Sequence, residues 1–171
     1  MNKKESFGNA RSKGLLVLTV SVIILVSFVT LHTAGVTGTG KRIEFQSISK
    51  GYYSGHTNPA YYVIQNADQW KDLWNQHTKI MLPQHPPPEV NFSKTTIIAV
   101  FMGQFSTGGY EIEVKEMIDT GLSVVVKVEK IYPGKGCIVT EAFSQPYHIV
   151  RVDKIDKHVI FNTSARTTEC G

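Results

Sequence analysis

Apolar residues follow two different patterns within the stretch from Thr95 to Val114. The run Ile97 to Met102 is apolar at every position, which is typical of a strand buried on both faces. Tyr110, Ile112 and Val114 instead alternate with charged residues, as in a strand with one face in water. We therefore predict a central strand and, after a short glycine-containing connection, a second strand nearer the surface.

The connection between these two strands is our leading candidate for a functional site. Glycines in such a loop permit positive φ or the close approach of another backbone, and binding residues concentrate on loops held by rigid scaffolds. Phe105 is informative, because an exposed Phe105 is a binding anchor and a buried one indicates only a tight loop. The candidate partner-binding residues of the loop are Gln104, Phe105, Ser106, Thr107, Gly108, Gly109 and Tyr110.

Alternating patterns elsewhere predict a mainly β fold. Leu122 to Val128 should form a hairpin with the strand that ends near Val114, across a turn at residues 119–121. Further strands are expected at Arg42–Ser49, Tyr61–Gln65, Cys137–Glu141, Gln145–Asp153 and His158–Ser164, the last two paired with each other. Hairpins about ten residues apart favour an antiparallel β-sandwich or open barrel of about seven or eight strands.

One amphipathic helix is predicted after Asn66. The Asn66 side chain can cap it by accepting from the backbone N–H of Gln69, which can itself reach back as in a capping box. An apolar stripe, with two indoles in it, should pack this helix on the sheet: Trp70, Leu73, Trp74 and His77. A ligand platform is the alternative use of the two indoles. Prolines from Pro83 to Pro88 end the helix and predict an extended connector.

The first 34 residues resemble a targeting segment. Four basic residues precede an uncharged apolar run of 17 residues, Leu15 to Leu31, which is the order of a signal peptide or an N-terminal transmembrane anchor. As a helix this run spans about 25 Å, close to the roughly 30 Å of a bilayer core. His32 makes a poor cleavage site before Gly35, which favours an uncleaved anchor with the rest of the chain outside the cytoplasm. Cleavage would instead give a secreted protein. Residues 35–41 then read as a flexible linker before a domain at 42–171.

Outside residues 1–34 the chain carries little net charge. Four of the 18 basic residues and one of the 14 acidic residues lie in residues 1–34, so the remainder of the chain has a net charge of only +1. A nucleic-acid-binding domain normally carries a concentrated basic face. We therefore expect no nucleic-acid partner.

Cysteine and histidine carry the remaining candidate chemistry. Cys137 and Cys170 are expected to form a disulfide, because such bonds persist in exported domains. The alternative is a Cys137 nucleophile with His148 as its base. The histidines have no paired short spacing, so we expect no metal site, and we expect no cofactor.

Several short motifs resemble the PrcB C-terminal domain family, named for a subunit of a bacterial surface protease complex. They are Val90 to Lys94, Thr107 to Tyr110, Pro133 to Cys137 and Pro146 to Val150, and the resemblance runs from about Ile43 to the C-terminus. It implies a non-catalytic interaction module that supports assembly or stability of a protease, and it supplies no catalytic residues. Pro146, Tyr147 and His148, within one of these motifs, join the candidate partner-binding residues.

Two other functions stay open. An exported protease inhibitor could act through the loop from Gly103 to Tyr110, since small exported β-sandwiches can insert loops into active-site clefts. An envelope-ligand binding domain or an enzyme would need paired carboxylates or an aromatic platform, for which Glu111 and Glu113 on one wet strand face are the nearest match.

Overall fold

The computed structural model describes residues 40–170 of the 171-residue chain. The predicted targeting segment at residues 1–34 and the linker up to residue 39 lie outside the described residues. Within residues 40–170 there is no helix with the length and apolar character needed to cross a membrane. The predicted linker ends sooner than expected, because Lys41 already belongs to the first strand.

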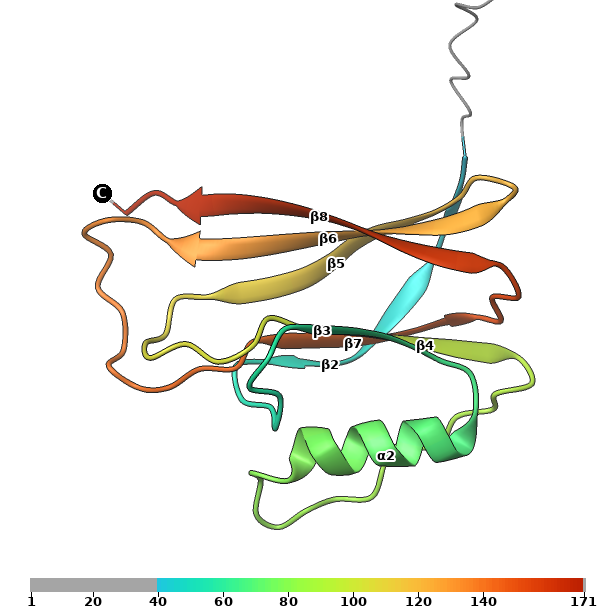
Figure 1. Cartoon of the computed structure of the whole chain (residues 1–171), viewed down its shortest axis with the longest axis horizontal. Helices are drawn as coiled ribbons and strands as arrows, with labels where there is room; N and C mark the ends of the chain where they lie inside the picture. The colour runs from blue at the N-terminus through green and yellow to red at the C-terminus, as the bar shows by residue number, and fades with distance from the viewer. Residues whose placement is uncertain (1–39, 171) are drawn as a thin grey trace, which may run out of the picture. The chain divides into compact units, whose positions relative to one another are not determined.

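In the described residues 40–170, eight strands form two four-stranded sheets, and one helix covers the outer face of one sheet (Figure 1). The first sheet has the order β1-β5-β6-β8, and the second has the order β2-β7-β4-β3. This confirms a mainly β, two-layered fold with one packed helix. In chain order the elements are β1 (Lys41–Ile43), β2 (Phe45–Gly51), β3 (Ala60–Ile64), α2 (Ala67–Thr78), β4 (Thr95–Phe101), β5 (Glu111–Asp119), β6 (Ser123–Pro133), β7 (Tyr147–Asp153) and β8 (His158–Thr168).

Strand β4 is central and buried on both faces, as its continuous apolar run predicts. Ile98 and Val100 point into the core between the two sheets, together with Ile112, Val114 and other residues of β5 and β6. The alternate positions Ile97, Ala99 and Phe101 point the other way and pack under the helix. The strand therefore joins two apolar layers, which is why no position in it is polar after Thr96.

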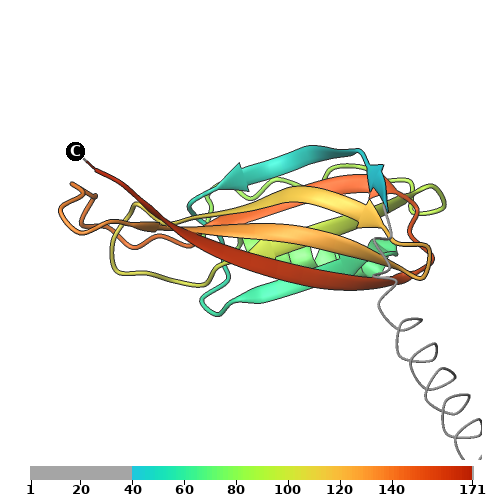
Figure 2. The ribbon, with the colours of Figure 1, turned by 90° about the horizontal axis from the view of Figure 1, so that it is seen from above.

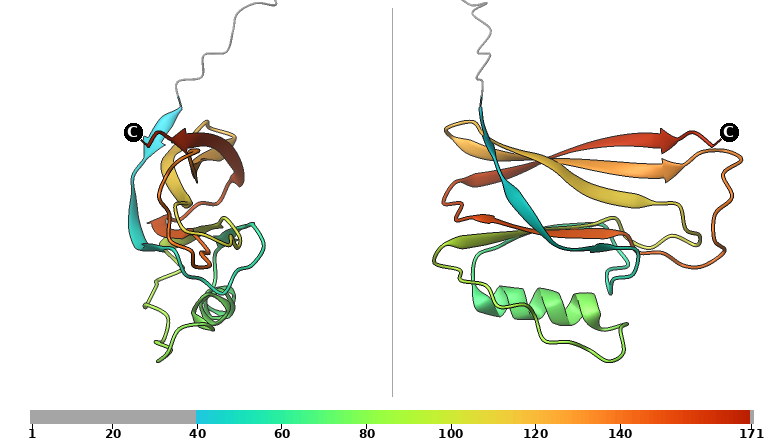
Figure 3. Two further views of the ribbon diagram at one scale, coloured as in Figure 1. Left: turned by 90° about the vertical axis from the view of Figure 1, so that its left-hand side faces the viewer. Right: turned by 180° about the vertical axis from the view of Figure 1, so that it is seen from behind.

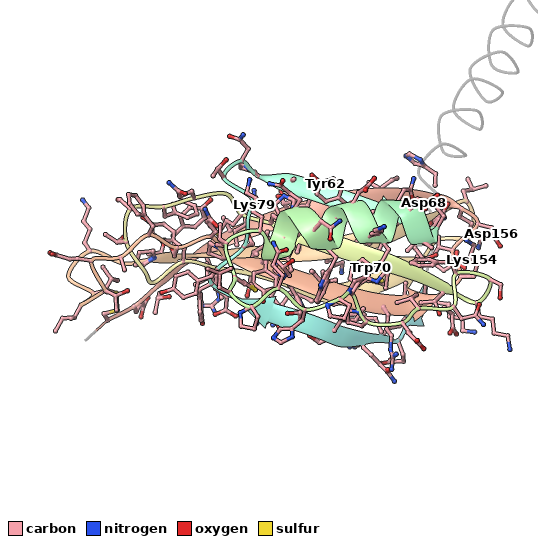
Figure 4. The ribbon with its side chains drawn as sticks, turned by 90° about the horizontal axis from the view of Figure 1, so that it is seen from below. Tyr62, Asp68, Trp70, Lys79, Lys154 and Asp156 are labelled. Carbon is pink, nitrogen blue, oxygen red and sulfur yellow. A yellow bond between two sulfur atoms is a disulfide. The ribbon has the colours of Figure 1, made fainter. Side chains whose placement is uncertain are left out.

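The helix begins where the sequence predicts. Asn66 Oδ1 accepts from the Gln69 N–H at 2.9 Å, whereas Gln69 Oε1 accepts from the N–H of Gln65, one residue before the cap. Trp70 and Leu73 are buried against the sheet. In Figure 4 Asp68 and Lys79 mark the two ends of the helix, and Trp70 lies on its side. The predicted stripe is thus a packing surface.

Both indoles also hold the proline connector in place. Trp70 Nε1 donates to the carbonyl of Pro88, and Trp74 Nε1 donates to the carbonyl of His85, each at 2.9 Å. Proline has no backbone N–H, so this segment is poorly suited to strand pairing. The two indole N–H groups supply hydrogen-bond donors to carbonyls that have no strand partner. The predicted connector is confirmed as a strap across the helix.

Three strand predictions are wrong in detail. The predicted strand at Arg42–Ser49 is divided at Glu44 into β1 and β2, which belong to different sheets. The segment Cys137–Glu141 is a loop. Strand β7 does not pair with β8, because β8 crosses to the other sheet and runs parallel to β6. One of the strand pairs is therefore parallel, and the sandwich is not wholly antiparallel.

The two ends of the sandwich carry different parts of the chain. The first strand enters beside the β5–β6 turn, where Lys41 pairs with Asp119. At the opposite end Gly51 and Phe101 both pair with Tyr147, so the loops that flank these residues meet there. The right-hand view in Figure 3 shows the entering strand and the C-terminus at opposite ends of the long strands.

Candidate functional site

Three loops that are far apart in the sequence meet at the end of the sandwich opposite to chain entry. They comprise residues 52–59, 103–110 and 134–146, and we call this region the loop end. All three begin or end at strands of the second sheet, since β2, β4 and β7 are neighbours there. The predicted glycine loop is therefore one of three loops that together form this surface.

Backbone hydrogen bonds join the three loops. Phe105 and Ser144 exchange both of their N–H to carbonyl bonds, at 2.8 and 3.0 Å. The Gln104 N–H donates to the Thr57 carbonyl at 3.0 Å, and the Gln145 N–H donates to the Tyr52 carbonyl at 2.6 Å. These bonds connect each loop to at least one other. The loop end is consequently a braced surface whose backbone needs little ordering on binding.

Side-chain bonds add to this bracing. Gln145 Nε2 donates to Gln104 Oε1 at 2.7 Å, and the Ser144 hydroxyl donates to the Thr107 carbonyl at 2.6 Å. The Gly108 N–H donates to the Thr140 carbonyl at 2.9 Å. Thr107 and Gly108 are thus held by the loop at 134–146.

The predicted anchor Phe105 is half-buried. Its ring stacks on Tyr110 with 3.8 Å between the ring centroids and an interplanar angle of 9°, and Tyr132 lies edge-on to Tyr110. Phe105 also packs against the core between the sheets. The burial of Phe105 supports the tight-loop alternative for this residue. Within the predicted loop the exposed residues are Gln104, Ser106 and Gly109.

Two glycines of this loop have positive φ, and each lies against different neighbouring residues. Gly109 has φ +87, and a Cβ there would meet Val139 and Pro133. Gly103 has φ +89 and lies against Pro59 and Thr57. Gly108 has ordinary φ, so our expectation of positive φ does not apply to it; a Cβ there would instead collide with the Thr140 side chain.

Exposed apolar side chains gather on the other two loops. Tyr52 and Tyr53 are 52% and 58% exposed, Phe143 is 65% exposed, and Ile138 is fully exposed. Large apolar groups that are left in water on a braced surface mark sites of protein interaction. Sequence reasoning missed these four residues. For Tyr52, Tyr53 and Phe143 the available signal was their position in segments of turn residues with no strand face to pack on. Ile138 was missed because residues 137–141 were predicted to be a strand and form a loop instead.

Pro146, Tyr147 and His148 are buried, so they support the loop end from below. His148 Nδ1 accepts from the Val114 N–H of the opposite sheet at 3.0 Å, and its Nε2 lies 3.1 Å from the Ser47 hydroxyl. Burial, followed by the charge of Lys50, lowers the pKa of His148 to about 4. A neutral ring is what lets Nδ1 act as an acceptor between the sheets.

Comparison with known protein families gives a match for the central part of the chain. Residues 96–153 match a family model described as PrcB C-terminal. This segment matches the PrcB C-terminal family. The resemblance drawn from the short motifs is thereby confirmed for these residues. No curated protein and no solved structure matches the chain.

The PrcB C-terminal match covers a defined part of the fold. It runs from β4 to the last residue of β7 and so contains the loops at 103–110 and 134–146 and the β5–β6 hairpin. Tyr52, Tyr53 and the whole of β8 lie outside it. The loop end is therefore built mainly, but not wholly, from the segment that matches the family.

The disulfide joins the matched segment to the C-terminal tail. Cys137 is bonded to Cys170, with 5.2 Å between their Cα atoms, as predicted. This bond contradicts the alternative of a Cys137 nucleophile, because the sulfur is no longer a thiol and His148 is engaged with Val114 and Ser47. The bond also holds the loop at 134–146 against the end of β8.

Two further histidines, His77 of α2 and His56 of the loop at 52–59, are buried against the second sheet. His56 stacks on Phe101 at 3.6 Å between centroids, and His77 meets the edge of Tyr147 at 4.3 Å. Burial is the main cause that lowers the pKa of each to about 4. Across residues 40–170 no group of three or more His, Cys, Asp or Glu side chains is placed to hold a metal ion.

Proposed function

We propose that this protein is a non-catalytic interaction module that works outside the cytoplasm and supports a surface protease complex through its loop end. The observation that carries the proposal is the braced surface at which Tyr52, Tyr53 and Phe143 remain exposed. The PrcB C-terminal match supports a protease-associated role, because the family is named for a protease complex subunit.

Location outside the cytoplasm is supported by two features. The basic residues followed by the apolar run of residues 15–31 have the order of an export signal or anchor. The Cys137–Cys170 bond is of the kind that persists in oxidising compartments. Mass spectrometry of the mature protein tests the anchor, since an intact N-terminus is expected and a new one near residues 35–39 would show cleavage.

A photo-crosslinking amino acid at position 143 tests the partner-binding role in the host cell. Leu122 is the matched control, because it is 92% exposed and lies in the β5–β6 turn at the opposite end of the sandwich. We expect a protease subunit to be crosslinked from position 143 and not from position 122. Equal crosslinking from both positions, or a product without any protease component, would contradict the proposal.

Once the partner is identified, its binding affinity for variants of this protein provides a second measurement. Phe143→Ser should weaken binding by about tenfold or more, which is the effect of losing an exposed aromatic anchor. Leu122→Ser should bind as the wild type does. Inhibition assays against the same protease separate the proposed support role from the inhibitor alternative.

A further inference from the structure

Strand β8 has one edge with no neighbour among the described residues. It pairs with β6 along its whole length, from Ser123 opposite His158 to Pro133 opposite Thr168. On its other side it is the last strand of the sheet, as Figure 2 shows for the dark red strand along the margin. No backbone hydrogen bond of the described residues reaches that side. An outward row of N–H and carbonyl groups therefore faces solvent.

The other three edges of the sandwich are short or interrupted. β1 has three residues, β3 has five, and β2 is broken by a register shift between Ser47 and Ser49. β8 has 11 residues, contains no proline or bulge, and has Arg166 as its one side chain of permanent charge. Natural sheets normally protect long edges by charges, prolines or bulges. This edge lacks that protection.

The edge is also held in a fixed shape. The parallel ladder to β6 supports every residue of β8, Arg166 Nε binds Glu129 at 3.2 Å, and the disulfide fixes the chain just beyond Thr168. Residues 162–167 are exposed on both faces of the strand. A strand added here would gain backbone hydrogen bonds without first ordering the edge.

We propose that the outer edge of β8 captures an extended segment of a protein partner by strand addition. Free backbone donors and acceptors at regular spacing select an extended backbone as their ligand. Beside Ile160, which is 45% exposed, the segment would carry an apolar side chain, whereas the exposed residues Asn162 to Thr167 place little restriction on its side chains. Proline would be excluded from it, since proline lacks the N–H that the edge needs.

A second copy of this chain fits the edge less well. Antiparallel pairing of two β8 strands centred on Thr163 would bring together Asn162 with Ser164 and Phe161 with Ala165, which is a largely polar contact. Permanent dimers bury large, mainly apolar interfaces, whereas one added strand gives a small contact of the transient kind. Capture of a partner's extended segment matches the chemistry of this edge.

This inference is independent of the proposed function. The β8 edge runs along the side of the sandwich, uses residues outside the PrcB C-terminal match and shares no exposed anchor with the loop end. Variants of one surface therefore leave the other unchanged. Loss of crosslinking at position 143 would not affect the measurements on β8, and the reverse also holds.

Hydrogen–deuterium exchange of the full chain in detergent tests the capture. The probe is a synthetic peptide of the sequence Ser123–Lys130, the strand that β8 already accepts as a neighbour, and the control peptide has proline in place of Val126. We expect exchange of the outward-pointing amides of residues 158–168 to slow about tenfold at a peptide concentration about ten times Kd, because the other amides already bond to β6. The control peptide should give no protection. Protection elsewhere, or none with either peptide, would overturn the proposal.

Adjacent proline variants identify the edge directly. Successive N–H groups of a strand point to opposite sides, so one of Thr163→Pro and Ser164→Pro breaks the ladder to β6 and the other removes only an outward donor. The variant that keeps its melting temperature should lose peptide protection, while Thr163→Ala and Ser164→Ala should keep it. Protection that survives in the stable proline variant would refute strand addition. So would a dimer, seen by light scattering, that the stable proline variant dissociates.

Discussion

Acid should unfold this domain before its carboxylates are protonated. His56, His77 and His148 are buried, and the pKa of each is lowered from 6.5 to about 4 in the folded state. A group with a lowered folded pKa binds protons more readily in the unfolded chain. The three neutral rings therefore contribute stability above pH 6.5, and this stability is lost as the pH falls towards 4.

The size of the effect follows from the pKa difference. A single histidine with these two pKa values loses about 2 kcal/mol of stability between pH 7.5 and pH 5. Because the charge of His56 contributes to the lowered pKa of His77, the two titrations are coupled, and the three rings together lose at most about 6 kcal/mol. This is comparable with the whole free energy of unfolding of an ordinary domain, about 5–15 kcal/mol. We expect the midpoint of urea unfolding to fall steeply over this range.

The carboxylates act in a separate range of pH. The pKa values of Glu113, Glu116 and Asp119 are also lowered, chiefly by bonds to lysine side chains, although burial opposes this and is the largest single influence on Glu113. Their stabilising effect is lost only below the ordinary values of 4.5 and 3.8. Loss of stability between pH 6.5 and 5 thus reports the histidines.

Urea unfolding followed by circular dichroism at several pH values measures this loss. In His148→Gln the decrease in stability between pH 7.5 and 5 should be smaller by about a third, because one of three titrating rings is gone. NMR signals of the three buried rings should stay constant down to about pH 5. A free energy of unfolding that is flat from pH 7.5 to 5, or buried rings that titrate near 6.5, would refute the reasoning.

Three other changes test the bracing of the loop end. Cys170→Ala opens a loop with a sequence separation of 33 and should remove about 4 kcal/mol, or roughly 15 °C of melting temperature, while two reactive thiols in the native protein would exclude the bond. Gly109→Ala should lower the melting temperature more than Gly121→Ala, since both glycines have positive φ but only Gly109 has close neighbours. Phe105→Ala should cost about 2 kcal/mol by urea unfolding, whereas Phe143→Ala should cost almost nothing; equal values would contradict the burial of Phe105.

Local features of the fold were predictable from the sequence. The Asn66 cap, the doubly apolar strand at Ile97–Met102 and the β5–β6 hairpin each depend on neighbours only a few residues apart. Their signals are a capping side chain, an unbroken apolar run and two alternating runs across a tight turn. Such features carry their own evidence in a short window.

The pairing of distant strands left no comparable signal. His158–Ser164 is rich in β-branched and aromatic residues, as a strand should be, but nothing in that window shows that it crosses to the other sheet and lies parallel to β6. The exposed residues of the loop end were missed for a related reason. Phe105 is half-buried because of Tyr110 and the backbone of Ser144, and Tyr52 and Phe143 join the loop end only through long-range bonds.

The placement of chain entry and loop end at opposite ends of the strands has a mechanical consequence. The 11 residues of β6 extend over about 36 Å between these ends. A pull between an anchor before Lys41 and a partner at the loop end would act along the strands, at right angles to their hydrogen bonds. Many bonds of β2 and β7 would then share the load, instead of opening one after another. A tether before Lys41 would thus load the strands along their length, without opening their hydrogen bonds one at a time.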